Sequence, residues 1–121
     1  MPARVVPVVI AAVVLATVGC WPPPGQGPKA ARGYQRAAPV IAALAQYRQA
    51  HGAFPDSLRE LVPNYLADSA LAVPTRTQEQ YPLEYRADSG GYELAFRYVG
   101  PGMNVCRYRS AAAKWNCGGY F

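Results

Sequence analysis

The chain has 121 residues, of which 51% are hydrophobic and 16% are charged, and its formal net charge is +5. This length suits one small domain, and the hydrophobic content excludes a wholly disordered chain. The chain has one His, seven Asp and Glu residues and three Cys, so it is poor in groups that catalyse reactions or bind metals. We therefore expect no enzymatic activity, no metal site and no cofactor.

The first 19 residues have the pattern of an export signal. Arg4 precedes an uncharged run over residues 5–19, which is shorter than a comfortable membrane span. Cys20 follows this run directly and resembles the acylated Cys of the bacterial lipobox, although Thr17 stands where that motif usually has Leu. The resemblance implies a lipoprotein with a lipid on Cys20; an uncleaved helical anchor and a secreted product are the alternatives. All three place the domain in the cell envelope, on the periplasmic or extracellular side of the membrane.

A stretch rich in Pro and Gly comes next and predicts a tether over residues 20–33. Its sequence WPPPGQGP cannot continue a helix and favours a stiff, partly extended chain. We expect this tether to hold a folded domain, residues 34–121, away from the membrane.

The first element expected after the tether is a helix over Ala30 to His51. Apolar residues recur there at helical spacing, at Ala37, Val40, Ile41, Leu44, Tyr47 and His51. Pro39 lies inside the pattern, so the helix either begins near Pro39 or kinks there. Gly52 suits its C-terminal cap.

A second, short helix is predicted over residues 54–62. Ser57 and Glu60 have the spacing of a capping box, and Pro63 ends the element. Residues 64–80 show no regular period, and we expect them to form a loop.

From Tyr81 onward apolar and polar residues alternate, which predicts four antiparallel strands joined by three turns. Hairpins folded about the turns pair Tyr85 with Leu94, Phe96 with Cys106, Cys106 with Cys117, and Tyr108 with Trp115. These residues then share one apolar face with Tyr81, Leu83, Tyr92 and Tyr98. The opposite face collects Glu84, Arg86, Glu93, Arg97, Arg107, Arg109 and Lys114, with Arg86, Glu93 and Arg109 in one row. The sequence thus predicts an α+β domain, with the N-terminal helix packed on a four-stranded antiparallel meander.

Cys106 and Cys117 are expected to form a structural disulfide. With Cys20 acylated they are the remaining pair, and an oxidising compartment outside the cytoplasm favours their bridging. A pair of free thiols is the alternative.

Several short stretches resemble the head domain of type IV pilin-like proteins, above all the pseudopilins of type II secretion. They are IAALAQYR at residues 41–48, HGAFPDSL at 51–58, LVP and YL within 61–66, YPLEY at 81–85 and GYEL at 91–94. The resemblance covers about residues 34–99. It implies a helix followed by a short helical segment and an antiparallel sheet.

Two departures from the pilin pattern limit what the resemblance implies. No acidic residue precedes Asp56, and the Pro-rich stretch interrupts the path of an N-terminal helix, so we do not expect prepilin processing or polymerisation through that helix. No Asp or Glu follows Glu93, so the calcium site of major pseudopilins is not expected either.

The sequence therefore predicts a non-enzymatic envelope protein, an accessory or structural component whose pilin-like head contacts another envelope protein. The alternative is a binding module for DNA or anionic glycolipid, through a face made by Arg86, Arg97, Arg107, Arg109 and Lys114. A solvated sheet face, partly neutralised by Glu84 and Glu93, is the simpler interpretation of these charges. His51 is expected to cap or pack at a helix end and not to act as a base.

Overall fold

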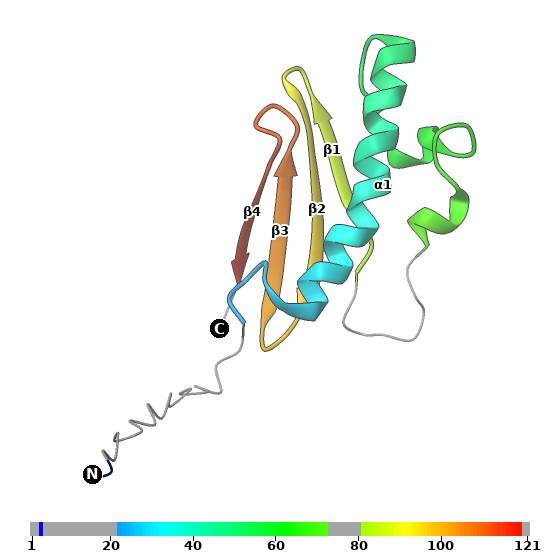
Figure 1. The fold of residues 1–121 in the computed structure, drawn as a ribbon. Coiled ribbons are helices and arrows are strands. Elements are labelled where there is room, and N and C mark those ends of the chain that lie inside the picture. Colours follow the sequence, from blue (N-terminus) through cyan, green and yellow to red (C-terminus); the bar gives the residue numbers. More distant parts are fainter. Residues whose placement is uncertain (1–2, 4–21, 73–80, 120–121) are drawn as a thin grey trace.

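A computed structural model describes residue 3, residues 22–72 and residues 81–119 of the chain. The predictions for the export signal and for lipidation of Cys20 lie outside these residues. One long helix packs against a four-stranded antiparallel sheet, which confirms the predicted α+β fold (Figure 1). The elements are α1 (Gly27–His51), two single-turn 3₁₀ helices, η1 (Leu58–Leu61) and η2 (Asp68–Leu71), and the strands β1 (Glu84–Asp88), β2 (Gly91–Val99), β3 (Met103–Arg109) and β4 (Lys114–Gly119).

α1 begins at Gly27, inside the segment that was predicted to be a tether, so residues 27–33 belong to the helix. Pro28 is tolerated in the first turn because the amide it lacks would have no partner within the helix. The chain just before α1 is also fixed to the domain. The N–H of Gly25 donates to the Tyr98 hydroxyl at 2.8 Å, and the Tyr34 hydroxyl donates to the C=O of Gly25 at 3.0 Å. The described part of the predicted tether is therefore docked on the head.

α1 continues through Pro39, so the helix does not begin near this residue. Pro39 leaves the C=O of Gln35 without its usual helical donor, but both residues are exposed, so water can hydrate that oxygen. The helix ends at Gly52 as predicted: Gly52 has a φ of 78°, and its N–H donates to the C=O of Arg48 at 2.7 Å.

The second predicted helix is shorter than expected. Of residues 54–62, only Leu58–Leu61 form η1. The predicted capping contact is present, because the N–H of Ser57 donates to Glu60 Oε2 at 2.9 Å. In the expected loop, Asp68–Leu71 form η2.

The sheet has the simple order β1-β2-β3-β4, and all four predicted residue pairs are confirmed. Because side chains alternate along a strand, the correct register fixes which residues face α1. We call the side that carries Leu94, Phe96 and Cys106 the inner face and the opposite side the outer face.

The core lies between α1 and the inner face. Its buried residues are Ala30, Ala37, Val40, Ala43, Leu44, Leu61, Leu66, Tyr92, Leu94, Phe96, Tyr98 and Cys106. α1 comes close to β2 at Gly33, where a Cβ atom would collide with the ring of Phe96. The helix can pack at this distance because the position has no side chain.

Two residues of the outer face are buried as well, which the alternation of polar and apolar residues does not predict. Ala95 is 3% exposed and Val105 is 4% exposed. Ala95 is paired with Glu84 and Arg107, and Val105 is paired with Arg97. Long charged side chains thus flank both small residues, and their aliphatic stems can shield them from water.

Candidate interaction surface on the outer face

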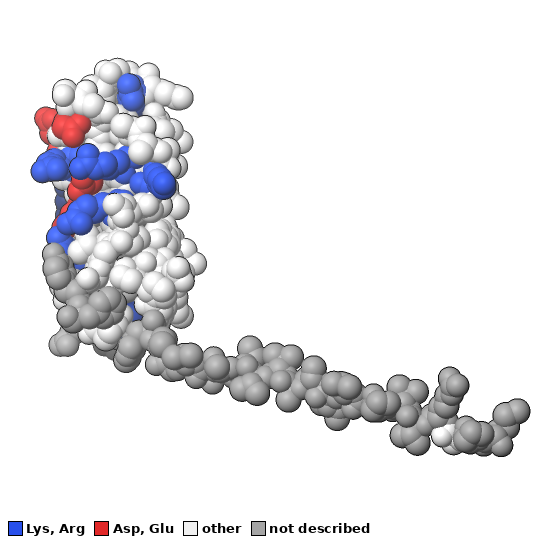
Figure 2. All heavy atoms as spheres, turned by 90° about the vertical axis from the view of Figure 1, so that its left-hand side faces the viewer, with Lys and Arg blue, Asp and Glu red and all other residues white. Residues whose placement is uncertain are grey.

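The outer face of the sheet lies on the side away from α1 (Figure 1). Figure 2 shows Lys and Arg side chains gathered in a band on this side of the molecule, with Asp and Glu among them. The strand residues responsible are the predicted ones: Glu84, Arg86, Glu93, Arg97, Arg107, Arg109 and Lys114. A further carboxylate, Asp88, lies at the end of β1 and accepts the N–H of Gly90 at 2.9 Å.

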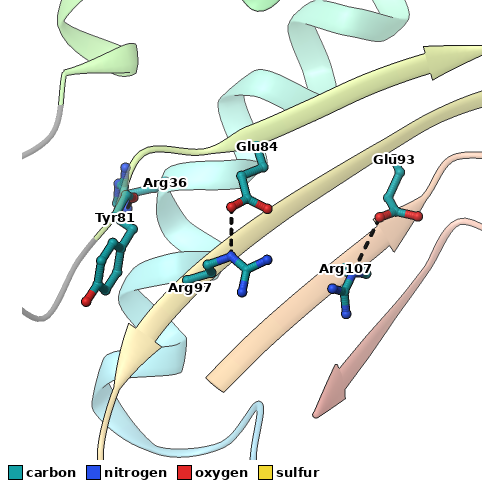
Figure 3. Close-up of polar contacts among 6 residues, drawn as sticks. All are labelled: Arg36, Tyr81, Glu84, Glu93, Arg97 and Arg107. Atoms are coloured by element: carbon teal, nitrogen blue, oxygen red, sulfur yellow. Dashed lines mark hydrogen bonds and ion pairs between the residues drawn. The ribbon is translucent and has the colours of Figure 1, made fainter. Parts of the chain in front are cut away.

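Glu93 is the carboxylate at the centre of this surface. It lies 3.4 Å from Arg107 Nε (Figure 3). It also lies 3.2 Å from Arg109, and its side chain is only 19% exposed. A second pair, Glu84 with Arg97 at 2.7 Å, lies further along β2. These pairs fix the guanidinium groups in place, although each exposed pair adds at most about 1 kcal/mol to stability.

The cations are concentrated on β3 and β4. Arg86, Glu93, Arg109 and Lys114 form a row across all four strands, which confirms the predicted row and extends it by Lys114. Arg109 and Lys114 are directly opposed, an arrangement of like charges that destabilises a sheet. Within residues 22–72 and 81–119, neither Arg86 nor Lys114 has a carboxylate partner.

Two shallow hollows lie on this surface. The first, of about 370 Å³, is lined by Glu84, Tyr85, Arg86, Glu93, Ala95 and Arg107. The second, of about 510 Å³, lies over β3 and β4 and is lined by Arg107, Arg109, Ala112, Lys114, Trp115 and Asn116. The second hollow combines three cations with the side-chain amide of Asn116, so it suits an anionic group.

The disulfide between Cys106 and Cys117 is present and joins directly opposed residues of β3 and β4, as predicted. The Tyr34 hydroxyl lies 3.2 Å from Cys117 Sγ, and the Tyr34 ring packs edge-on against Trp115 with centroids 5.1 Å apart. Together with its bond to Gly25, Tyr34 links α1, the disulfide and the N-terminal stretch.

His51, the one imidazole of the chain, packs at the end of α1. Its ring stacks on Tyr47 with centroids 4.1 Å apart, and Nε2 lies 3.3 Å from the hydroxyl of Tyr65. The residue is exposed and stands between two tyrosines. This packing matches the role at a helix end that the sequence suggests.

Burial shifts the pKa of several ionisable groups of the domain. Burial, with smaller contributions from Glu60 and Asp56, raises the pKa of Tyr85 to about 12. Burial also raises the pKa of Tyr92 and lowers the pKa of Arg36. Arg36 donates to the C=O of Tyr81 at 3.0 Å and so fastens the chain before β1 to α1 (Figure 3).

Among the described residues no three His, Cys, Asp or Glu side chains come together as metal ligands would. In the same ranges no helix has both the length and the apolar character needed to cross a bilayer.

Some residues that shape the site were not predicted. Trp115 and Asn116 line the cationic hollow, but in the sequence Trp115 only indicates the inner face. Asn104 is 2% exposed and donates to the C=O groups of Gly100 and Gly102 at 3.3 and 3.1 Å, which holds the β2–β3 turn. An Asn two residues after a Gly-Pro-Gly turn is the signal that could have indicated it.

Comparison with protein-family models, with curated proteins and with solved structures finds no match to this chain.

Proposed function

We propose that this chain is a non-enzymatic, lipid-anchored protein of the cell envelope whose pilin-like head acts by contacting another envelope protein. The observation that carries the proposal is the outer face: an ordered, charged sheet surface on the side away from α1, with cations that lack partners among the described residues. The resemblance to pseudopilin heads supports a role as an accessory or structural component of a secretion or pilus system.

The docked N-terminal stretch supports an anchor that positions the head. Pro24 lies beside Gly119, and Gly25 is bonded to both Tyr34 and Tyr98. An acylated Cys20 would precede the first described residue of this stretch, Pro22, by two positions, a distance of about 7 Å in an extended chain. The head would then lie close to the membrane surface.

Metabolic labelling with a radioactive fatty acid tests the anchor. The full chain should incorporate label, and the Cys20→Ser variant should not. Labelling that persists in this variant would contradict a lipoprotein anchor. A Cys106→Ser, Cys117→Ser double variant should keep its label, because those residues form the disulfide.

Crosslinking in intact cells, followed by affinity capture of the full chain, tests the contact function. We expect a discrete second envelope protein in the captured material. Capture of the chain alone, at crosslinker levels that trap known envelope complexes, would contradict the proposal.

The second candidate function is binding of DNA or an anionic glycolipid through the cationic part of the outer face. Its support is the hollow lined by Arg107, Arg109 and Lys114. Filter binding over a series of salt concentrations tests it, since contacts with phosphates weaken steeply with salt. The Arg107→Ala, Arg109→Ala variant should lose most binding. Absence of binding at low salt, or no effect of these substitutions, would exclude this function.

A further inference from the structure

β4 ends the sheet, and no described element pairs with its far edge (Figure 1). An edge of this kind carries N–H and C=O groups that can pair with another chain. The hydrogen-bond pattern of the sheet determines which residues of β4 direct their backbone groups outward.

The hydrogen bonds between β2 and β3 show which residues of β3 direct their backbone groups toward β2. The N–H of Ser110 donates to the C=O of Tyr92 at 3.0 Å, so this pair is joined by a backbone hydrogen bond. Hydrogen-bonded and non-hydrogen-bonded pairs alternate along an antiparallel ladder. Phe96 and Cys106 lie an even number of steps away, so they too form a hydrogen-bonded pair, and the backbone groups of Cys106 face β2.

Cys106 and Cys117 must therefore be a non-hydrogen-bonded pair. Their Cα–Cα distance of 4.1 Å agrees, because non-hydrogen-bonded pairs are the closer type. Cys117 thus directs its N–H and C=O away from β3, and Trp115 and Gly119 do the same because each lies two residues away. These residues present three N–H and three C=O groups along the edge of β4 with which no described element pairs.

The charges beside this edge indicate what a pairing strand would carry. On the outer face the edge strand holds Lys114 and Asn116, next to Arg109 and Arg107. The cationic hollow of about 510 Å³ opens over the same residues. A carboxylate placed there would offset the direct opposition of Arg109 and Lys114.

We propose that β4 receives an extended, acidic segment of a partner protein, which adds to the sheet as a fifth strand. Its backbone would bond with Trp115, Cys117 and Gly119, and its carboxylates would lie on the outer face beside Lys114. Apolar side chains at the alternate positions would lie next to the half-buried ring of Trp115. The inference rests on the proposed contact function and names the chemistry of the partner; it does not depend on an anchor at Cys20.

The charge of the outer face favours such a partner over a second copy of this chain. The strand residues of that face include the cations Arg86, Arg97, Arg107, Arg109 and Lys114 and the carboxylates Glu84, Asp88 and Glu93. Pairing of two β4 strands would join two surfaces that both carry excess positive charge, whereas an acidic strand complements the surface.

The test uses the full chain in detergent micelles and a synthetic hexapeptide that alternates glutamate and valine. Amide hydrogen exchange is followed by NMR with and without the peptide. The amides of Trp115, Cys117 and Gly119 should exchange at least about tenfold more slowly with the peptide, whereas those of Asn116 and Gly118, already bonded to β3, should change little. The same peptide with N-methylated amides should give no protection.

Charge variants distinguish addition of the peptide to β4 from a general electrostatic attraction of the peptide to the outer face. Lys114→Glu should weaken peptide binding about tenfold, because it replaces an attraction by a repulsion at the edge. Arg86→Glu is the matched control: it makes the same change of charge on the same face, but on β1 at the opposite edge, and should weaken binding less than about twofold.

Three results would overturn the inference. The first is slower exchange on adding the peptide at amides other than those of Trp115, Cys117 and Gly119. The second is equal weakening of peptide binding by Lys114→Glu and Arg86→Glu. The third is slow exchange of the three amides without peptide that is lost on dilution, which would indicate pairing of two copies. In each case the contact function would still stand if crosslinking in cells captures an envelope protein. The contact function itself would be contradicted only if crosslinking in cells captures no envelope protein.

Discussion

Gly33 lies where α1 passes closest to β2, and a methyl group there would be forced into the Phe96 ring. We predict that Gly33→Ala lowers the free energy of unfolding by about 1 to 3 kcal/mol, although alanine favours a helix more than glycine does. Urea denaturation of the full chain measures this. Gly118→Ala is the control, because no atom lies within 4 Å of its added Cβ, and it should not lower stability. Equal stability of the Gly33 variant would mean that α1 does not pack on Phe96 as described.

Tyr85 connects the sheet to the segment after α1, since its hydroxyl donates to the buried Pro55 C=O at 2.7 Å. Its pKa is about 12 in the folded protein, against about 10 in the unfolded chain. The stabilisation by the neutral phenol is therefore complete below pH 10 and is lost as the pH rises from 10 towards 12.

For Tyr85→Phe we predict a loss of about 1 kcal/mol at pH 7, because the Pro55 C=O loses its donor. The variant should also lose stability less steeply than the parent chain between pH 10 and 12. Urea denaturation across this range measures both effects. Identical pH slopes would show that Tyr85 ionises equally easily in the folded and unfolded chains.

The β3–β4 hairpin is closed by the disulfide across a sequence separation of 11 residues. We predict that replacing both Cys106 and Cys117 by Ala costs about 2 to 3 kcal/mol of unfolding free energy, mainly by releasing the unfolded chain. Urea denaturation of the variant and of the reduced parent chain should give the same loss. A variant as stable as the oxidised parent would contradict a stabilising bridge.

The four strands could be predicted from the sequence because their turns are short and their period is two, so each turn fixes a register and each register fixes a face. The row from Arg86 to Arg109 was predictable for the same reason. The start of α1 could not be predicted from the sequence. Gly25 is held by Tyr98, which lies 73 positions away in the chain, and local composition does not indicate this contact. The burial of Ala95 depends in the same way on side chains of neighbouring strands.

In the whole molecule, α1 covers the inner face of the sheet, and the stretch before α1 is bonded to the head through Gly25, Tyr34 and Tyr98. No element that the structure describes covers the outer face or pairs with the far edge of β4. We propose that these two surfaces make the contact with another envelope protein.

Site-specific photo-crosslinking in intact cells tests the central claim most directly. A photoreactive amino acid replaces Asn116, on β4, or Gln46, an exposed residue of α1, in the full chain. We predict that position 116 yields a discrete product containing a second envelope protein and that position 46 does not. No product from position 116, or a product containing only nucleic acid or lipid, would contradict a protein contact at the sheet.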